Sequence, residues 1–211
     1  MQAIYNPEVF DVQNESEAKS IILTPEGSTT KERWETETPF LAKDICSFIH
    51  PDEDSLVLDF GCGIGRISEA LITESHCNVL GLDISQSMRE LSVKYVSSEK
   101  FSSVAPLIIN RFAESGLKVD ACVSIWVLQH CPNVEEEIRL IKKVLKPGGY
   151  FYILNNISSA IPSNIGWVND GKNILNILEN EFNLVGYSQL PTEYTTEHIS
   201  KNSFIGKYRN K

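Results

Sequence analysis

The sequence has little of what membrane, secreted or nucleic-acid-binding proteins need. No apolar run approaches the roughly 18 to 20 residues of a membrane-spanning helix, and the acidic first twenty residues contain no signal-peptide core. Basic residues are scarce, since 19 Lys and Arg face 28 Asp and Glu, and the formal net charge is −9. Nucleic-acid binding rests on basic surface that displaces counterions. We therefore expect neither a membrane nor a nucleic acid as a partner.

Cysteine and histidine are also sparse and unpatterned. The five cysteines are odd in number and form no CxxC pair, and most lie in apolar stretches, as small buried side chains do in a reducing compartment. The four histidines have no metal-ligand spacing, so the sequence predicts no metal site. These patterns predict a cytoplasmic protein, and they carry no information on its oligomeric state.

The chain length suits one globular unit with a polar N-terminal segment. The 211 residues, 42% hydrophobic and 22% charged, are enough for one domain with a core and short for two. The first 35 or so residues are polar and weakly periodic. A helix is expected from Thr38, with Pro39 in its first turn and Pro51 after its end. We accordingly divide the chain into a lid or cap segment (1–38) and a main domain (39–211).

Short apolar runs then alternate with amphipathic stretches. The alternation predicts a parallel α/β sheet with helices on both faces. Ser87 and Glu90 have the spacing of a capping box, with Ser85 as the other candidate cap, and Asn133 is placed to cap a later helix. Strands are expected at 55–60, 78–82, 105–109, 119–125, 150–154, 182–187 and 203–208, and helices at 66–74, 85–96, 133–145 and 172–181.

A glycine cluster follows the first of these strands. Gly61, Gly63 and Gly65 occupy alternate positions between strand and helix, where they permit positive φ and expose backbone amides to a ligand. Asp83 ends the next strand and is placed to accept hydrogen bonds from a ribose diol. The GxGxG spacing differs from the GxGxxG of dinucleotide sites. Asp59, two residues before the cluster, suits a nucleoside that carries an ammonium group.

Four segments together resemble one known family. Residues 57–65, 81–88, 119–132 and 144–154 are similar in order and spacing to the class I S-adenosylmethionine-dependent methyltransferases of the small-molecule and diverse-substrate group. The likeness spans roughly residues 40–208. It implies a Rossmann-like, doubly wound, mostly parallel seven-stranded α/β sheet whose last strand, at 203–208, is antiparallel.

The resemblance implies S-adenosylmethionine as cofactor and assigns a role to each motif residue. The backbone of Gly61, Cys62 and Gly63 would contact its methionine portion and ribose. Asp59 would lie near its amino group, and Asp83 would bind the ribose hydroxyls.

A second group of residues is assigned to the adenine and the sulfonium. Ile84 and Met88 would flank the adenine, with plain core packing as the alternative. Asn110 and Phe112 stand where the family commonly has Asp. Asn110 would accept a hydrogen bond from the exocyclic amine of the adenine, and Phe112 would stack on its ring. Trp126 would lie near the sulfonium or fill the core.

The reaction implied is methyl transfer to an O, N or C nucleophile of a small molecule. His130 is the candidate general base, and its alternative role is to orient the following loop. Arg33 is expected to be solvated, with pairing to the cofactor carboxylate as the alternative. Two other functions stay open: a protein or peptide methyltransferase, and a non-catalytic S-adenosylmethionine-binding regulatory protein of the same fold.

Overall fold

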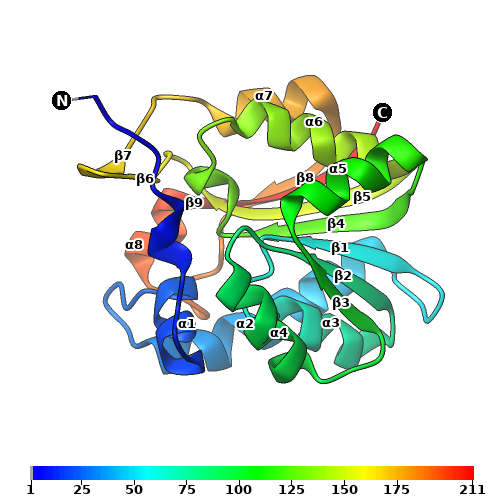
Figure 1. Cartoon of the computed structure of the whole chain (residues 1–211), viewed down its shortest axis with the longest axis horizontal. Helices are drawn as coiled ribbons and strands as arrows, with labels where there is room; N and C mark the ends of the chain where they lie inside the picture. The colour runs from blue at the N-terminus through cyan, green and yellow to red at the C-terminus, as the bar shows by residue number, and fades with distance from the viewer. Residues whose placement is uncertain (1) are drawn as a thin grey trace.

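A seven-stranded sheet lies between two layers of helices in the computed structural model, which describes residues 2–211 (Figure 1). The strand order is β3-β2-β1-β4-β5-β9-β8. Strands β1 to β5 pair in parallel, and β9 is antiparallel to both of its neighbours. The predicted doubly wound, mostly parallel sheet with an antiparallel last strand is confirmed.

The elements follow the expected alternation. The sheet contains β1 (Leu56–Phe60), β2 (Asn78–Leu82), β3 (Phe101–Val104), β4 (Val119–Ile125), β5 (Leu145–Asn156), β8 (Phe182–Ser188) and β9 (Ser203–Asn210). The helices are α1 (Glu15–Ile22), α2 (Thr30–Ile49), α3 (Arg66–Ser75), α4 (Gln86–Val96), α5 (Pro106–Ser115), α6 (Val134–Val144), α7 (Ile174–Glu181) and α8 (Glu197–Asn202), with short 3-10 turns η1 (Pro7–Phe10) and η2 (Leu128–His130).

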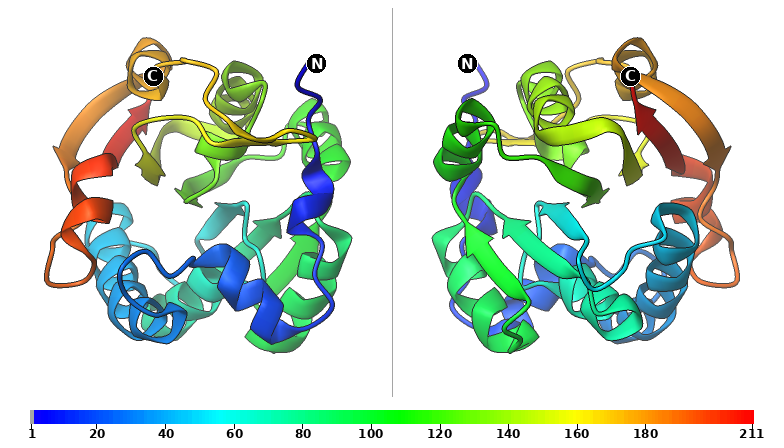
Figure 2. Two further views of the ribbon diagram at one scale, coloured as in Figure 1. Left: turned by 90° about the vertical axis from the view of Figure 1, so that its left-hand side faces the viewer. Right: turned by 90° about the vertical axis from the view of Figure 1, so that its right-hand side faces the viewer.

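Each face of the sheet has its own apolar core. Helices α2, α3 and α4 cover one face and α5, α6 and α7 cover the other (Figures 1 and 2). On α6, Ile138 and Ile141 are fully buried and pack in the same cluster as Phe151 of β5. On α2, Leu41 and Ile45 pack in the cluster of the opposite face. Because both faces are covered, the central strands are apolar on both sides, as their sequences indicated.

The strand predicted at 105–109 is wrong. The third strand is β3, which precedes it, and residues 106–115 form α5. Pro106 occupies the first turn of α5, where its missing N–H costs nothing. Ile109 and Ala113, four residues apart, are the buried positions of this helix, so the apolar run has a helical period. The real strand was missed because Ser102 and Ser103 interrupt its apolar pattern.

The helix expected from Thr38 begins eight residues earlier. A capping box starts α2, in which Thr29 accepts from the backbone N–H of Glu32 and the Glu32 carboxylate accepts from the N–H of Thr29. Pro39 therefore lies inside the helix. The division of the chain at residue 38 falls in the middle of α2, and this continuous helix joins the two parts that the sequence separated.

Two of the later caps differ from the expectation. Ser85 caps α4, since its Oγ accepts from the N–H of Met88, and the proposed box at Ser87 does not form. Asn133 stands at the start of α6 but makes no side-chain capping bond. Leu145, expected to end α6, is the first residue of β5.

Several short elements that the sequence did not predict cover the carboxyl ends of the strands, and two of them, η1 and α1, lie in the segment expected to be a lid or cap. They are η1, α1, α8 and the two-stranded hairpin of β6 (Ile161–Ser163) and β7 (Gly166–Val168). Residues 2–12, which we call the strap, run past this end of the sheet (Figure 2, left). Tyr5 pairs with Ser163 of the hairpin. None of the helices described over residues 2–211 is both long and apolar enough to cross a membrane.

The far end of the strap is tied to the loop after β2. The backbone N–H of Val12 donates to Ser87 Oγ at 2.9 Å, and Ser85 Oγ donates to the carboxylate of Asp11 at 2.8 Å. Ser85 also donates its backbone N–H to Asp83 Oδ1 at 2.9 Å. The strap is therefore bonded to the segment that carries the candidate ribose acid.

Candidate active site

A cavity of about 820 Å³ opens at the carboxyl ends of β1 and β4. The strand order reverses between these two strands, and ligands of open α/β sheets bind at such a point. The loops after β1, β2 and β4 form its floor, helices α5 and α6 line one side, and the strap, α1 and the β6–β7 hairpin cover it. The structure thus brings most of the predicted site residues into one space.

The glycine turn has the backbone conformation that only glycine adopts freely. Gly61, Gly63 and Gly65 have φ values of 80°, 53° and 85°. A Cβ on Gly63 would lie 2.7 Å from Cδ1 of Ile22 on α1, and one on Gly61 would overlap the side chain of Val127. A side chain at Gly61 or Gly63 would therefore overlap Val127 or Ile22, both of which line the cavity.

The amides of this turn do not point at a ligand, contrary to the sequence expectation. Gly61 and Cys62 both donate their N–H to the carbonyl oxygen of Leu82, at 2.7 and 2.8 Å. Gly63 donates to Asp83 Oδ2 at 2.8 Å. The turn and the end of β2 thus form one hydrogen-bonded unit, and the N–H groups of these three residues are engaged within the protein.

Asp83 lies at the end of β2 and is only 9% exposed. Its two carboxylate oxygens each accept one backbone N–H, from Gly63 and from Ser85. Burial raises the pKa of Asp83, and these two hydrogen bonds oppose the rise. A carboxylate has about four acceptor positions, so the group is held rigidly and keeps capacity for a diol.

Asp59 is buried at the base of the cavity. Its Oδ2 accepts from Ser68 Oγ at 2.6 Å. Burial raises its pKa to about 6, against the opposing effects of the Ser68 bond and the Arg66 charge. Desolvation of this kind favours the neutral acid, and a ligand cation would favour the carboxylate.

The raised pKa of Asp59 predicts how stability depends on pH in the ligand-free protein. The folded state holds this proton more tightly than the unfolded state, so the free energy of unfolding falls as pH rises from about 4 to about 6. The contribution is about 3 kcal/mol, from roughly two pKa units. Asp59→Asn keeps an acceptor for Ser68 and should reduce this fall in urea titrations. The exposed Asp54→Asn variant is the control, and an equal pH dependence in both variants would contradict the assignment.

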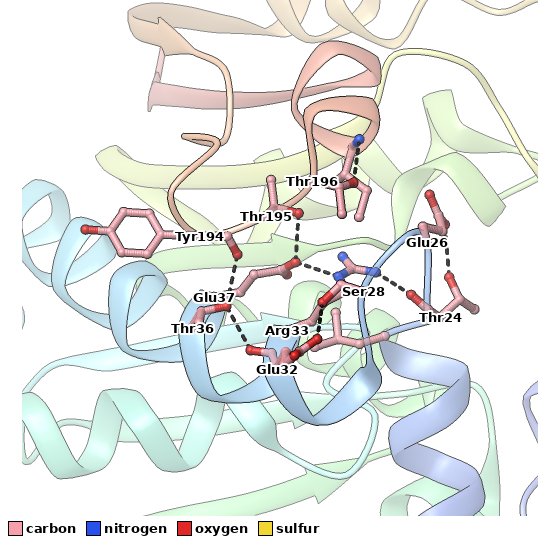
Figure 3. Close-up of polar contacts among 12 residues, drawn as sticks. Thr24, Glu26, Ser28, Glu32, Arg33, Thr36, Glu37, Tyr194, Thr195 and Thr196 are labelled. Atoms are coloured by element: carbon pink, nitrogen blue, oxygen red, sulfur yellow. Dashed lines mark hydrogen bonds and ion pairs between the residues drawn. The ribbon is translucent and has the colours of Figure 1, made fainter.

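Two arginines and a glutamate form a buried cluster beside Asp59. Arg33, 4% exposed, donates from Nε to Glu37 Oε1 at 2.6 Å and from Nη1 to the carbonyl oxygen of Thr24 at 2.8 Å (Figure 3). Thr195 also donates to Glu37 Oε1, so the C-terminal segment joins the cluster. The expectation that Arg33 is solvated is therefore wrong, because α2 carries this side chain into the cavity wall.

Arg66 is the second cation of this cluster. It is 2% exposed and donates from Nη1 to Thr38 Oγ1 at 3.1 Å. Burial lowers its pKa to about 10, and the charge of Glu37 opposes the shift. Within residues 2–211, Arg66 Nε and Glu37 Oε2 are buried without hydrogen-bond partners. A cation in the first turn of a helix is unfavourable because it opposes the helix dipole. This feature, which the sequence-based predictions did not include, could have marked Arg66 as a functional residue.

Trp126 follows β4 with its backbone in the left-handed region, at φ 63°. Its side chain lines the cavity, and the Arg33 guanidinium lies 5.7 Å from the centre of its ring. Its indole Nε1 is buried without a partner within the part of the chain that the structure describes. Strained backbone of this kind is found where surrounding structure holds a side chain in a functional position.

The residues predicted for the adenine lie in different environments. Ile84 is 47% exposed and lines the cavity. Met88 also lines it but is buried, and it packs in one apolar cluster with Val12 and Ile64. Cys62 also lines it.

Of the pair on α5, only Asn110 reaches the cavity wall. Phe112 packs against the core cluster instead. Side chains two positions apart on a helix point to different faces. The expectation that Phe112 contacts the adenine is therefore wrong.

His130, on the turn η2, lies among aromatic side chains at the strap. Its Nδ1 is 2.6 Å from the carbonyl oxygen of Ala160, which can only accept, so Nδ1 carries the proton of the neutral ring and Nε2 is an acceptor. The amide nitrogen of Gln129 lies 3.3 Å from Nε2. Burial lowers the pKa of His130, and the bond to Ala160 opposes this. The ring is therefore a neutral base near pH 7.

Sequence reasoning missed the residues that complete this part of the cavity. They come from the strap, α6 and the hairpin, and they are Tyr5, Phe10, Glu137 and Trp167. No local pattern marks them, because their common position depends on how the covering segments pack. Phe10 and Trp167 lie 5.6 and 5.3 Å from His130, between ring centres.

Comparison with known sequences shows which proteins the central segment is similar to. The family model described as "Methyltransferase domain" matches residues 58–153, which contain the glycine turn, Asp83 and His130. The sterol 24-C-methyltransferase of Aspergillus fumigatus is 30% identical over 102 residues, which are 47% of this chain and 27% of that protein. The ubiquinone biosynthesis O-methyltransferase of Idiomarina loihiensis is 31% identical over 139 residues, 59% of this chain and 57% of that protein.

Comparison with solved structures supports the same fold. The N-methyltransferase NodS from Bradyrhizobium japonicum WM9, solved with S-adenosyl-L-homocysteine, superposes with a TM-score of 0.65 at 19% identity over 84% of this chain and 87% of that one. The chain has the class I methyltransferase fold. Its residues 58–153 are similar to the methyltransferase family model, and the chain spans between about a quarter and somewhat over half of the curated relatives described above.

Proposed function

We propose that the protein is an S-adenosylmethionine-dependent methyltransferase that acts on an O, N or C nucleophile of a small molecule. One observation carries the proposal. A single cavity at the strand-order reversal brings together the glycine turn, the ribose acid Asp83 and the buried cluster of Asp59, Arg33 and Arg66. These groups match a nucleoside that carries both an ammonium and a carboxylate group. The family match and the cofactor product in the NodS structure support it.

The residues present fit this cofactor. Asp83 would hold the ribose hydroxyls, and Ile84, Met88 and Asn110 would surround the adenine. Arg66 Nε, buried and without a partner, is a donor suited to the carboxylate of the amino-acid end, and Asp59 is suited to its ammonium group. The bound cofactor supplies a methyl group on a sulfonium sulfur, which is already activated for displacement.

The chain's own contribution would be positioning, exclusion of water and removal of one proton. The strap and hairpin cover the cavity and keep bulk water from the reacting groups. Trp126, held by its backbone, would present an indole face and N–H beside the methyl donor. His130 would accept the proton of an O or N nucleophile at Nε2, since Ala160 holds the proton on Nδ1.

The covered cavity favours a small molecule over a protein or peptide acceptor, and the net charge of −9 disfavours nucleic acid. A cytoplasmic location fits the five cysteines, none of which is paired in a disulfide among the described residues.

Two measurements test the function. Calorimetry should show binding of S-adenosylmethionine and S-adenosylhomocysteine and no binding of NAD. Incubation with metabolite pools should then give a product heavier than its precursor by one CH₂ unit in mass spectra. Failure to bind either sulfur nucleoside contradicts the proposal. Binding without any methylated product supports the regulatory alternative, and product only on peptides supports the protein methyltransferase.

The ribose acid gives a quantitative prediction. Asp83→Ala removes a charged acceptor whose hydrogen bonds are worth about 1.5 to 3 kcal/mol each. The affinity for S-adenosylhomocysteine should fall at least about tenfold. Calorimetry on the folded variant, compared with the exposed Asp54→Ala, checks this. Unchanged affinity in a variant with wild-type circular dichroism would show that Asp83 does not hold the nucleoside.

A further inference from the structure

The cavity continues past the cofactor-binding groups into a space walled by aromatic side chains. Phe10 of the strap, His130 of η2 and Trp167 of β7 lie within 6.4 Å of one another, measured between ring centres. Tyr5 joins them from the strap. Three separate segments of the chain thus contribute aromatic rings to one part of the wall, and Trp167 stays 59% exposed there.

Charge is distributed unequally along this cavity. Arg33 and Arg66 are the only Lys or Arg side chains among the described residues that line it, and both belong to the cluster around Asp59 and Glu37. The charged cavity residues of α6 are both acids, Glu136 and Glu137. Glu137 lies near Tyr5 of the strap and near Cys131, which follows His130, because its charge helps to raise the pKa of both groups. An anionic acceptor would meet only negative charge there.

Glu137 is a partly buried carboxylate without a cation. Within residues 2–211 no Lys, Arg or His nitrogen lies within 4.0 Å of it, and it accepts no side-chain hydrogen bond. Burial raises the pKa of Glu137, with a further rise from Glu136. The same carboxylate helps to raise the pKa of Tyr5 to about 12, after burial and Cys131, so it lies near Tyr5 of the strap. Burying a carboxylate without a partner costs free energy that a bound cation would recover.

We infer that the acceptor carries a protonated amine on an aromatic or apolar body, and that Glu137 binds this amine beside the rings of Phe10 and Trp167. A carboxylate next to aromatic faces attracts an ammonium group by charge and by the ring quadrupole. We call these three residues the amine subsite. The inference rests on the proposed function and narrows its substrate class.

The test uses three probes of similar size and different charge: phenethylamine, 2-phenylethanol and 3-phenylpropanoate. The full chain is saturated with S-adenosylhomocysteine, and binding is followed by calorimetry and by the indole N–H signals of its three tryptophans in NMR spectra. The amine should bind most tightly and the carboxylate most weakly. Glu137→Gln should weaken amine binding about tenfold and leave the alcohol unchanged. Glu179→Gln, the same charge change at an exposed position of α7, should alter neither.

The outcomes separate this inference from the proposed function. Carboxylate binding as tight as amine binding, no binding of any probe, or equal effects of Glu137→Gln and Glu179→Gln each overturn the amine subsite. If S-adenosylhomocysteine fails to bind while the amine still binds in a Glu137-dependent manner, the proposed function is wrong and the subsite stands. If the nucleoside binds and the amine does not, only the subsite is wrong.

Discussion

His130→Ala should lower the single-turnover rate of methyl transfer by roughly 10²–10⁴-fold, the usual contribution of a general base, and leave the affinity for S-adenosylhomocysteine unchanged. The expectation follows from the ring's contacts. Nδ1 donates to Ala160, so Nε2, which lies 3.3 Å from the Gln129 amide nitrogen, is the nitrogen that can take the proton. Since burial lowers the pKa of His130 below its usual 6.5, the wild-type rate should rise with pH through a value below 6.5 and be level at neutral pH.

His130→Asn separates this catalytic role from an anchoring one. The asparagine amide can donate to the carbonyl of Ala160 and cannot act as a base. If His130 is the base, both variants lose turnover and the acidic limb of the pH profile disappears. If it only anchors the loop, the asparagine restores the rate, and the alanine variant loses stability and nucleoside affinity together. Rapid-quench measurement of a single turnover distinguishes the two.

Gly63→Val should reduce nucleoside binding by more than roughly a hundredfold, because a branched side chain is strained at positive φ and would fill the ligand side of the turn. The φ of 53° and the 2.7 Å from the added Cβ to Ile22 Cδ1 give the two causes. The same change would also disturb the N–H that Gly63 donates to Asp83. Calorimetry with S-adenosylhomocysteine measures the loss.

Gly116→Val is the matched control for backbone strain. Gly116 has a φ of 85° and no heavy atom within 4 Å of an added Cβ, and it lies after α5, outside the cavity wall. Its variant should lose folding stability, by about 1 to 3 kcal/mol, and bind the nucleoside normally. If the two variants bind equally well, the turn around Gly63 does not contact the ligand.

The sequence predicted the central fold because its strands and helices are marked locally. The runs that became β1, β2 and β4 are apolar and end at glycine or aspartate, and α6 repeats its apolar residues at helical spacing. The prediction failed where tertiary context decides. Strand β3 was missed because Ser102 and Ser103 interrupt its apolar pattern, and the apolar start of α5 resembles a strand.

The site divides in the same way. Asp59, Gly63 and Asp83 follow from strand ends and glycine spacing, and they lie together in the cavity. The burial of Arg33 and the aromatic wall around Trp167 depend on segments distant in the chain that pack over the strand ends. A single sequence carries no signal for such contacts.

The bonds from Asp11 and Val12 to the loop of Ser85 and Ser87 have a consequence for ligand order. The strap, whose residues line the cavity, is attached to the same loop that holds Asp83, so one closed arrangement would serve both the proposed nucleoside and the proposed acceptor. A nucleoside that stabilises this arrangement removes part of the ordering cost of acceptor binding. By thermodynamic reciprocity, a bound acceptor strengthens nucleoside binding by the same factor. The two ligands are therefore expected to bind with positive cooperativity.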